Sequence, residues 1–371
     1  MRILIVIDSL GAGGAERSTA VFCEYLESKK IYFDILCLDK KEVGFQQELL
    51  SKGYSISFLK NIGLASQVKE IAEVIKNGNY DLVHSILFRS NIRTRLSKLF
   101  VNFNHLESLV NTTYSIERFS DERVNKYGLR LYKLIDQVTA KKGVDHFHSI
   151  TKAVKEHYVK ELGLNPQQIT VVPRGRKPLL LNYQEKAPTF SSTIKIINVG
   201  RHEFQKGQIY LLRAVKILIS ENYNLHLKIL GRNGTATNQL TNYIKENNLE
   251  EHVSLIGFTN DVPTYLKEAD LFVFPSLYEG LGGALIEAQS AGLPVACNDI
   301  SVLHEVVEKN KNAKFFNVHD INSVVTALRF FLDSKDNCEE YGRASLKNFY
   351  EKFLESNNNK RLLDLYTTLI Q

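Results

Sequence analysis

FPSLYEGLGGALIEA, residues 274–288, reads as the end of a buried strand, a glycine-rich turn and the start of a helix. The strand is expected to end at Pro275, because proline cannot donate a hydrogen bond within a central sheet. The helix is expected to begin near Gly282. A strand that leads through a short turn into a helix is half of a β-α-β unit, from which parallel sheets are built. This stretch therefore predicts an α/β fold.

Short apolar runs and segments of helical period alternate along the chain on both sides of this stretch. In the second half we expect strands near residues 194–199, 225–230, 252–256, 271–274, 294–297 and 313–316. In the first half we expect strands near residues 2–7, 31–38, 55–59, 81–84, 106–111, 146–150 and 169–172. Amphipathic helices fill the gaps, for example over residues 15–29 and 64–76. The pattern predicts two doubly wound domains, each with a parallel sheet.

The break between the two domains is placed at YQEKAPTFSS, residues 183–192, which has no hydrophobic period and contains Pro188. The predicted bounds are 1–183 for the first domain, 184–193 for the linker, 194–350 for the second domain and 351–371 for a C-terminal helix. We expect this helix to pack back on the first domain. Open parallel sheets bind ligands outside the carboxyl ends of their strands, so a shared cleft between the two sets of strand ends is expected to hold the ligand.

The composition is that of an ordinary globular protein, with 44% hydrophobic and 24% charged residues in a chain of 371. No apolar run approaches the roughly 18 residues that a membrane span needs. The four cysteines include no C-x-x-C pair, which predicts buried reduced thiols and no zinc site. Residues 1–185 hold 27 of the 47 Lys and Arg residues but only 20 of the 41 Asp and Glu residues. This basic half suits an anionic substrate, nucleic acid or an anionic membrane, or it is a plain solvated surface.

Two glutamates, Glu279 and Glu287, are separated by seven residues in the turn and the helix that follows it. Glu287 has apolar neighbours, and a carboxylate buried among them needs a hydroxyl or N–H partner. Sugar and ribose hydroxyls are such partners; the alternative is a capping glutamate and a helix glutamate bonded to the backbone. Gly280, Gly282 and Gly283 leave bare N–H groups at the helix start, which suits an anion or a hydroxyl.

A further loop follows the first strand of each domain. VGRHEFQKG, residues 199–207, carries Arg201 and Lys206, and two cations there could neutralise a diphosphate. DSLGAGGAER, residues 8–17, opens a helix with clustered glycines that let a ligand approach the backbone. A dinucleotide fingerprint would need glycine where Glu16 stands, which disfavours a nicotinamide dehydrogenase. A solvated basic loop and a tight strand–helix turn are the alternatives.

Glu279 and Glu287 match the E-x7-E motif of retaining glycosyltransferases with the GT-B fold. Residues 257–295 resemble the donor-binding region of glycosyltransferase family 4, of the bacterial polysaccharide, O-antigen and capsule type. Residues 199–207 resemble that family's basic phosphate-binding loop, and residues 11–17 resemble its N-terminal glycine loop. The resemblance covers nearly the whole chain. It implies two Rossmann-like domains that face each other across a cleft, the first on the acceptor side and the second binding a nucleotide-sugar.

The resemblance also implies roles for single residues. Arg201 and Lys206 would hold the donor diphosphate and stabilise the leaving phosphate, and Glu279 would contact the donor sugar. These three are the implied catalytic residues. The implied donor-binding residues are Gly13 and Gly14 facing the phosphates, Gly231 and Phe258 flanking the nucleobase, Glu287 on the ribose, and Arg201, Lys206, Glu279, Leu281, Gly282 and Gly283.

One position departs from the family pattern. Many members have a histidine after the fifth strand of the first domain, near the reacting sugar, and Asn111 stands there in this chain. Glu16, His84 and Arg174 are further candidates on the acceptor side, although a structural role explains His84 equally well. The substitution at Asn111 keeps open the alternative of a non-catalytic glycosyltransferase-like subunit.

The activity implied by the resemblance is that of a cytoplasmic, retaining hexosyltransferase. It would need no cofactor and would use a UDP-sugar, with a GDP-sugar as the alternative. The sequence has no D-x-D triplet and no metal-ligand cluster, so we expect metal-independent transfer. The acceptor would be a hydroxyl of a saccharide or a lipid-linked saccharide in the synthesis of a cell-surface polysaccharide or glycoconjugate. A nucleotide-sugar epimerase of the same architecture is the other alternative, and no nucleic-acid-binding module is recognisable.

Basic residues in the first domain suggest peripheral contact with the anionic inner face of the cytoplasmic membrane. Residues 118–134 are expected to form an amphipathic helix. Its apolar residues Leu129, Leu131, Tyr132 and Leu134 are expected on or near one face.

Overall fold

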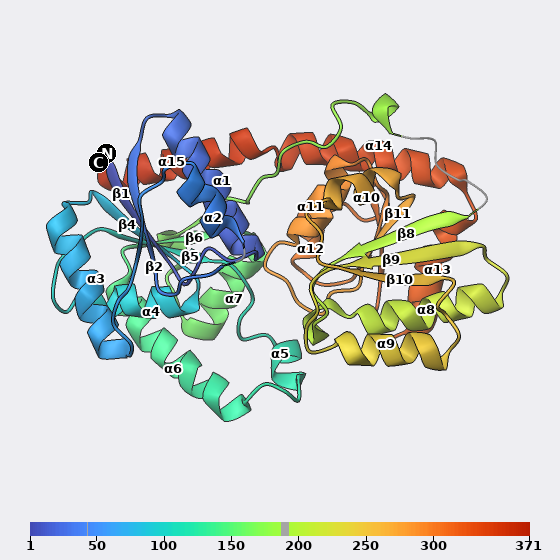
Figure 1. The fold of residues 1–371 in the computed structure, drawn as a ribbon, viewed down its shortest axis with the longest axis horizontal. Helices are drawn as coiled ribbons and strands as arrows, with labels where there is room; N and C mark the ends of the chain where they lie inside the picture. The colour runs from blue at the N-terminus through green and yellow to red at the C-terminus, as the bar shows by residue number, and fades with distance from the viewer. Residues whose placement is uncertain (43, 187–192) are drawn as a thin grey trace. The chain divides into compact units, whose positions relative to one another are not determined.

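The computed structural model describes residues 1–42, 44–186 and 193–371, and the chain folds into two compact units (Figure 1). The first unit comprises Met1–Tyr114, Glu122–Gly175 and Ser356–Gln371. The second comprises Ser115–Asp121 and Arg176–Glu355. Each unit contains one parallel sheet, so the predicted α/β class with two sheets is confirmed. Most of the predicted linker, residues 187–192, lies outside the described residues.

The first unit is built on a seven-stranded sheet in the order β3-β2-β1-β4-β5-β6-β7. Its strands are β1 (Arg2–Ile7), β2 (Tyr32–Cys37), β3 (Ile56–Phe58), β4 (Leu82–Ile86), β5 (His105–Leu109), β6 (His146–Ser149) and β7 (Ile169–Val171). The central strand β1 is buried from its second residue onward, because helices cover both faces of a parallel sheet.

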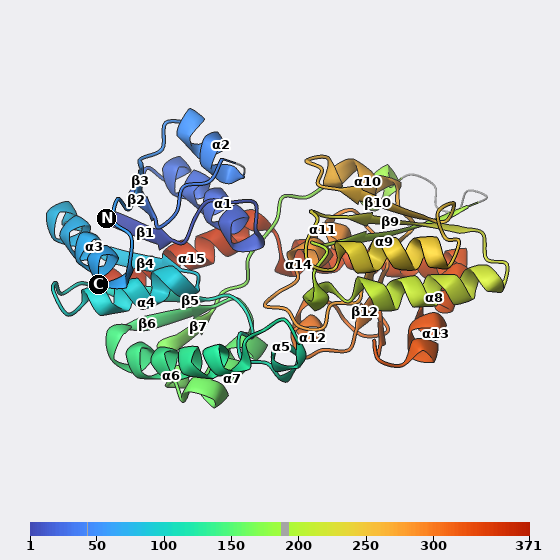
Figure 2. The same ribbon diagram turned by 60° about the horizontal axis from the view of Figure 1, so that its bottom comes forward.

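Helices cover both faces of this sheet (Figure 2). They are α1 (Gly14–Ser28), α2 (Phe45–Ser51), α3 (Leu64–Gly78), α4 (Phe88–Ser97), α6 (Lys126–Gly143), α7 (Lys152–Leu162) and α15 (Glu355–Ile370), with the 3-10 turn η1 (Pro166–Gln168). Helices α1, α2 and α15 pack on the face formed by Ile3, Ile5 and Ile7. Helix α3 packs on the other face, against Leu4 and Val6.

The prediction of one continuous helix over residues 118–134 is wrong. The chain instead forms α5 (Ile116–Ser120), which belongs to the second unit, and then a polar loop before α6. The loop ends where the side chain of Asn125 accepts the N–H of Gly128 at 3.0 Å and caps α6. Leu129 lies on the buried face of α6, whereas Leu131 and Leu134 are exposed.

The second unit is built on a six-stranded sheet in the order β10-β9-β8-β11-β12-β13. Its strands are β8 (Ile194–Val199), β9 (Leu225–Leu230), β10 (Val253–Gly257), β11 (Leu271–Phe274), β12 (Val295–Asn298) and β13 (Ala313–Phe316). Its helices are α8 (Gln208–Ser220), α9 (Thr237–Glu246), α10 (Val262–Glu268), α11 (Gly283–Ser290), α12 (Leu303–Val306), α13 (Ile321–Leu332) and α14 (Lys335–Lys352), with the 3-10 turns η2 (Tyr183–Glu185) and η3 (Phe204–Lys206). Helices α8 and α9 lie on one face of the sheet, and α10 and α11 lie on the other (Figure 1).

The order of the strands reverses once in each sheet, between β1 and β4 and between β8 and β11. At such a point the crossover helices leave toward opposite faces, and a crevice opens at the carboxyl ends of the two strands. Strands β8 and β11 pair directly, so the loops that follow them begin side by side. Within residues 1–42, 44–186 and 193–371, none of the helices has the length and apolar character that a bilayer-spanning segment requires.

Candidate functional site

Two loops are joined at the point where the second sheet reverses its strand order. Residues 200–207 follow β8, and residues 275–282 follow β11. The backbone N–H of Leu277 donates to the carbonyl of Gln205 at 2.8 Å, and the side-chain amide of Gln205 donates to the carbonyl of Tyr278 at 2.7 Å. The basic loop and the glutamate loop therefore form one continuous surface.

Lys206 and Glu279 form an ion pair across these two loops. Nζ of Lys206 lies 2.5 Å from Oε1 of Glu279, and the two side chains are only 17% and 9% exposed. Nζ also lies 5.7 Å from the centre of the Phe274 ring, within the range of a cation–π contact. The protein thus holds a cation at the carboxyl ends of β8 and β11, where solvent ions screen its attraction for an anion less than on an open surface.

Glycines allow the two loops to lie so close together. Gly207 has a φ of +60°, and a Cβ atom there would lie 2.1 Å from the carbonyl oxygen of Pro275. A Cβ atom on Gly231, which follows β9, would lie 2.0 Å from the carbonyl oxygen of Gly200. A side chain at Gly207 or Gly231 would therefore push the backbone of the site apart.

Arg201 is the exposed cation of the basic loop. Among the described residues its guanidinium has no hydrogen-bond or ion-pair partner, and its carbonyl accepts the N–H of Glu203 at 2.7 Å within a tight turn. A guanidinium without a protein partner can present its planar fork to two oxygens of a phosphate. Arg201 and Lys206 thus give one loop two cations, one exposed and one partly buried.

Glu287 lies in α11 and is paired with Arg176. Nε of Arg176 donates to Oε1 of Glu287 at 2.8 Å, and the two side chains are 7% and 13% exposed. Gly283 leaves room for the guanidinium, because a Cβ atom there would lie 2.5 Å from Nη2 of Arg176. The sequence patterns place Arg176 only as a cation near the cleft or at the hinge and give it no role in the donor site. The apolar neighbours of Glu287 indicate that it needs a partner, but not which residue, 111 positions away, supplies it.

The remaining predicted donor residues of this unit also follow strand ends or begin a helix. Gly231 follows β9 and Phe258 follows the neighbouring strand β10. The Phe258 ring is half exposed, and the guanidinium of Arg232 lies 5.8 Å from its centre. Leu281 and Gly282 are buried, and Gly282, with a φ of +82°, is the N-cap of α11.

The glycine loop of the first unit leads into α1. Gly13 is the N-cap of this helix and Gly14 is its first residue. Glu16 turns back over the loop, so that a Cβ atom on Gly13 would lie 2.3 Å from its carboxylate, whereas a Cβ atom on Gly14 would meet no atom within 4 Å. A carboxylate is favoured at a helix N-terminus. An anionic ligand would therefore reach this helix past Gly14 or displace the carboxylate of Glu16.

His84 lies inside β4 rather than after a strand, because β4 continues for two residues beyond it. The ring is buried, with Nδ1 2.5 Å from the hydroxyl of Tyr366 and Nε2 2.7 Å from the hydroxyl of Ser108. Ser108 also contacts Nδ1 of His148 at 2.9 Å, and Nε2 of His148 donates to the carbonyl of Val172 at 2.8 Å. Tyr366 belongs to α15 and Ser108 to β5, so His84 links α15 to the sheet through its two ring nitrogens.

Burial also sets the protonation of these two histidines. It lowers the pKa of His84 well below its ordinary value and lowers the pKa of His148 to about 4. Both imidazoles are therefore neutral near pH 7 and exchange hydrogen bonds as neutral rings.

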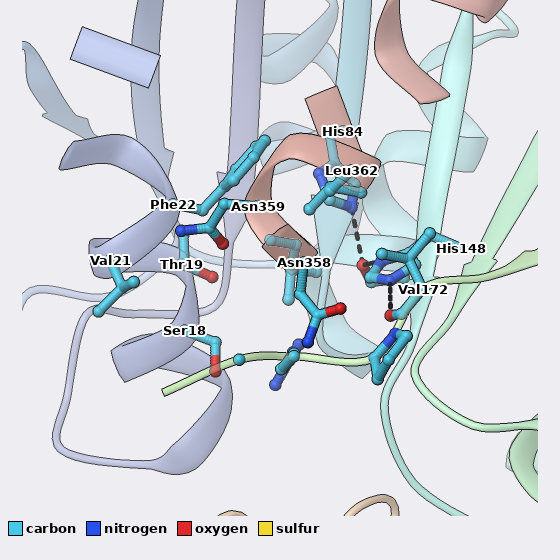
Figure 3. Close-up of a pocket in the computed structure, with 15 residues that line it drawn as sticks. Ser18, Thr19, Val21, Phe22, His84, His148, Val172, Asn358, Asn359 and Leu362 are labelled. Carbon is cyan, nitrogen blue, oxygen red and sulfur yellow. Dashed lines mark hydrogen bonds between the residues drawn. The ribbon is translucent and has the colours of Figure 1, made fainter. Parts of the chain in front are cut away.

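A small pocket that is partly open to solvent lies over this chain of hydrogen bonds in the first unit (Figure 3). Its lining is Ser18, Thr19, Val21, Phe22, His84, Ile86, Ser108, His148, Val172, Pro173, Arg174, Gly175, Asn358, Asn359 and Leu362. His84 and Arg174 are predicted site residues that the structure brings to one pocket. His148 of β6 and Asn358 and Asn359 of α15 are not predicted; the two asparagines reach this pocket only through the packing of α15.

Asn111 follows β5, and its side-chain oxygen accepts the N–H of Thr112 at 2.9 Å. It lies outside the lining of this pocket. Among the described residues, no three His, Cys, Asp or Glu side chains come together as a group that could hold a metal ion.

Both halves of the chain match models of glycosyltransferase families. Residues 12–178 match the model described as Glycosyltransferase Family 4, and residues 182–348 match the model described as Glycosyl transferases group 1. The two matches together leave only the ends of the chain and three residues between them unmatched.

Relatives with enzymatic descriptions cover most of the chain. The UDP-Gal:alpha-D-GlcNAc-diphosphoundecaprenol alpha-1,3-galactosyltransferase of Escherichia coli is 27% identical over 346 residues, which span 87% of this chain and 85% of that protein. The capsular polysaccharide biosynthesis glycosyltransferase CapH of Staphylococcus aureus is 26% identical over 318 residues, which span 85% of this chain and 86% of that protein.

Solved structures share the fold over the full length. Anabaena HepE in complex with UDP has a TM-score of 0.82 at 15% identity, covering 99% of this chain and 100% of that chain. A glycosyltransferase from Rickettsia africae has a TM-score of 0.81 at 17% identity, covering 100% of this chain and 99% of that chain. The predicted GT-B fold is confirmed.

Proposed function

Because the chain belongs to the glycosyltransferases of group 1 and family 4, we propose that it transfers a hexosyl group from a UDP-sugar to a hydroxyl of a lipid-linked saccharide. The Escherichia coli relative supports both substrates, since its name describes a UDP-Gal donor and a diphosphoundecaprenol-linked acceptor. The product would contribute to a cell-surface polysaccharide or glycoconjugate, as the capsular relative suggests.

One observation carries the assignment of the donor site. Lys206 and Glu279 come from two different motifs, yet they form a 2.5 Å ion pair on loops that are bonded to each other at the carboxyl ends of β8 and β11. A ligand with both a diphosphate and a sugar suits this pair, because the ammonium can bind phosphate oxygens while the carboxylate accepts from sugar hydroxyls. Arg201 adds a second cation without a protein partner among the described residues.

In the proposed reaction the bond between the anomeric carbon and the diphosphate oxygen breaks. A bond then forms from the acceptor oxygen to the same face of that carbon, so the anomeric configuration is retained. Negative charge develops on the departing diphosphate, where Arg201 and Lys206 stabilise it electrostatically. The proton of the acceptor hydroxyl passes to the departing phosphate oxygen, and UDP leaves.

The pair of Glu287 and Arg176 would bind the ribose. A carboxylate oxygen accepts hydrogen bonds from ribose hydroxyls, and Arg176 fixes its orientation by donating to Oε1 at 2.8 Å. Arg176 in this account is a positioning residue, because it acts on the ligand through Glu287.

A lipid-linked acceptor would hold the enzyme close to a membrane. The basic first half of the chain suits peripheral contact with an anionic inner leaflet, and location in the cytoplasm at that surface is part of the proposal.

The test is a thermal-unfolding screen of the protein with UDP, GDP, ADP and the corresponding nucleotide-sugars. We expect UDP and one UDP-sugar to raise the unfolding temperature, because a ligand at 100 times its Kd stabilises the native state by about 2.7 kcal/mol. Arg201→Ala should lose the UDP effect, and Arg329→Ala is the matched control, since Arg329 is an arginine of the same unit that pairs with Glu221. A response to GDP alone would overturn the donor assignment.

Transfer and epimerisation are separated with the nucleotide-sugar that stabilises the protein most. The proposal expects this donor to persist unchanged without an acceptor and to release UDP with one. Formation of an epimer from the donor alone would contradict transfer as the activity.

A further inference from the structure

The exposed face of α6 carries a continuous row of large apolar side chains. Tyr127, Leu131, Leu134, Ile135 and Val138 follow the spacing i, i+4, i+7, i+8 and i+11, which places them on one face of the helix. Tyr127 is 82% exposed, and Leu131, Leu134 and Val138 are 56% to 59% exposed. Apolar side chains on a soluble surface are usually scattered singly, whereas a contiguous row marks an interaction surface. We call these five residues the α6 stripe.

The stripe cannot turn inward, because the opposite face of α6 is fixed to the unit. The buried residues of the helix are Leu129, Asp136, Ala140 and Gly143. Asp136 accepts from Nη1 of Arg95 at 2.5 Å and from the hydroxyl of Tyr114 at 2.7 Å. Helix α6 runs along the outside of the first unit, packed against α4 and α7 (Figure 2).

The charged side chains outside the buried face of α6 are all cations. Its cations are Lys126, Arg130, Lys133, Lys141 and Lys142, and Asp136, its one acid, is buried against Arg95. Lys141 and Lys142 extend the stripe at its C-terminal end, at helical spacing from Leu134 and Val138. Lys133 is paired with Glu161 of α7 at 2.5 Å, so the other four cations give the solvent-facing side of the helix its positive charge beside the apolar row.

We propose that the α6 stripe docks on an anionic phospholipid bilayer, with the helix lying in the plane of the interface. The apolar row would enter the boundary between head groups and acyl chains, and the flanking cations would contact lipid phosphates. Two copies of this chain facing each other through α6 would bring like charges together, which opposes self-association through this surface. The inference rests on the proposed function, since it places the enzyme where a lipid-linked acceptor is embedded.

The experiment measures binding of the full-length protein to vesicles, without donor or acceptor. Equimolar phosphatidylglycerol and phosphatidylcholine vesicles are compared with vesicles of phosphatidylcholine alone. We expect cosedimentation with the anionic vesicles at low salt, weakened at raised salt and at least about tenfold weaker with phosphatidylcholine alone. The triple variant Leu131→Ser, Leu134→Ser, Val138→Ser should lose at least about tenfold in partition coefficient, because buried apolar side chains no longer contribute.

Two further variants make this result specific. Ile62→Ser removes an apolar side chain that is 96% exposed elsewhere in the first unit, and it should leave vesicle binding unchanged. Arg130→Gln, Lys141→Gln, Lys142→Gln should weaken binding to anionic vesicles at least about tenfold and reduce its salt dependence. All of these positions are exposed or lie at the exposed face, so circular dichroism should show native folding in each variant.

Vesicle binding of the stripe variant equal to that of the wild type would overturn the inference. So would a wild-type dimer that the stripe variant converts to monomer while neither protein binds vesicles. UDP-induced thermal stabilisation of the same preparations separates this inference from the proposed function. Loss of vesicle binding with an intact UDP effect removes only the docking surface, whereas vesicle binding without a UDP effect removes the donor assignment.

Discussion

Lys206 and Arg201 are the two side chains on which the proposed chemistry depends most. We expect Lys206→Ala and Arg201→Ala each to lower kcat/KM at least about tenfold, because a lost contact of about 1.4 kcal/mol in the transition state gives that factor. The rate of UDP release from the stabilising UDP-sugar, in the presence of acceptor, measures the effect. Arg329→Ala is again the control, and near-normal turnover in both site variants would contradict their role.

Arg176 is expected to act through Glu287 and not on the reacting atoms. Arg176→Ala should therefore raise KM for the UDP-sugar more than it lowers kcat, and Arg176→Lys should restore part of the loss. The double variant Arg176→Ala, Glu287→Gln should lose less transition-state stabilisation than the sum of the two single losses, because the residues share one interaction. Additive effects in this cycle would show that Arg176 does not work through Glu287.

At the scale of residues, the sequence predicts which positions carry charge beside glycines, but not how they pair. Lys206 and Glu279 are both predicted site residues, since each follows a strand of the second half. Their ion pair and the pairing of Glu287 with Arg176 depend on packing between segments far apart in the chain. His84 shows the reverse case, where a predicted site residue has both ring nitrogens bonded inside the first unit.

Close approach of the loops after β8 and β11 depends on Gly207. We expect Gly207→Ala to reduce both activity and thermal stability, because φ is +60° and the new Cβ atom would lie 2.1 Å from the carbonyl oxygen of Pro275. Gly53→Ala is the matched control, since Gly53 has a φ of +82° but no atom within 4 Å of a Cβ position. It should show only the conformational cost of about 1–2 kcal/mol. Equal unfolding temperatures for the two variants would contradict the steric argument.

Helix α15 is fixed to the first unit by Tyr366. Its ring is fully buried and lies 5.3 Å from the Phe22 ring, and its hydroxyl is hydrogen-bonded to Nδ1 of His84. Tyr366→Phe should lower stability by about 1–2 kcal/mol through the lost hydrogen bond. Tyr366→Ala should cost about 3–5 kcal/mol through the cavity it leaves. Thermal unfolding should rank wild type above Phe and Phe above Ala; no difference between Phe and Ala would contradict a packed α15.

At the scale of elements, buried strands are the best predicted. The observed ranges of five strands agree with the predicted ranges to the residue: β1, β8, β9, β11 and β13. A strand in a parallel sheet is covered by helices on both faces, so it reads as a short continuous apolar run in the sequence. The segment around α5 and α6 is predicted poorly. There the side-chain cap at Asn125, and not hydrophobic period, sets where α6 begins.

The protein as a whole should lose stability as pH falls from about 6.5. Burial lowers the pKa of His105 to about 3 and that of His148 to about 4, and lowers the pKa of His84 as well. These rings stay neutral in the native state while the unfolded chain takes up protons below about pH 6.5, so the unfolding free energy falls by up to about 1.4 kcal/mol per pH unit for each histidine. Urea unfolding at pH 7.5 and pH 5.5 tests this prediction, because ordinary carboxyl groups titrate below both pH values. Equal free energies of unfolding at the two pH values would contradict it.

The whole-molecule prediction of two parallel α/β sheets follows from the repeated strand–turn–helix pattern, which occurs in both halves of the chain. The small segment Ser115–Asp121 escapes such a prediction, because it belongs to the second unit although its neighbours in sequence belong to the first. Membership of a unit is decided by contacts, which hydrophobic period does not encode.

A crystal structure of the protein with UDP tests the central claim most directly. The account predicts the diphosphate against Arg201 and Lys206, on the surface formed by residues 200–207 and 275–282, with the ribose at Glu287. UDP bound elsewhere on the second unit, or on the first unit alone, with Arg201 and Lys206 free of phosphate contacts, would contradict it.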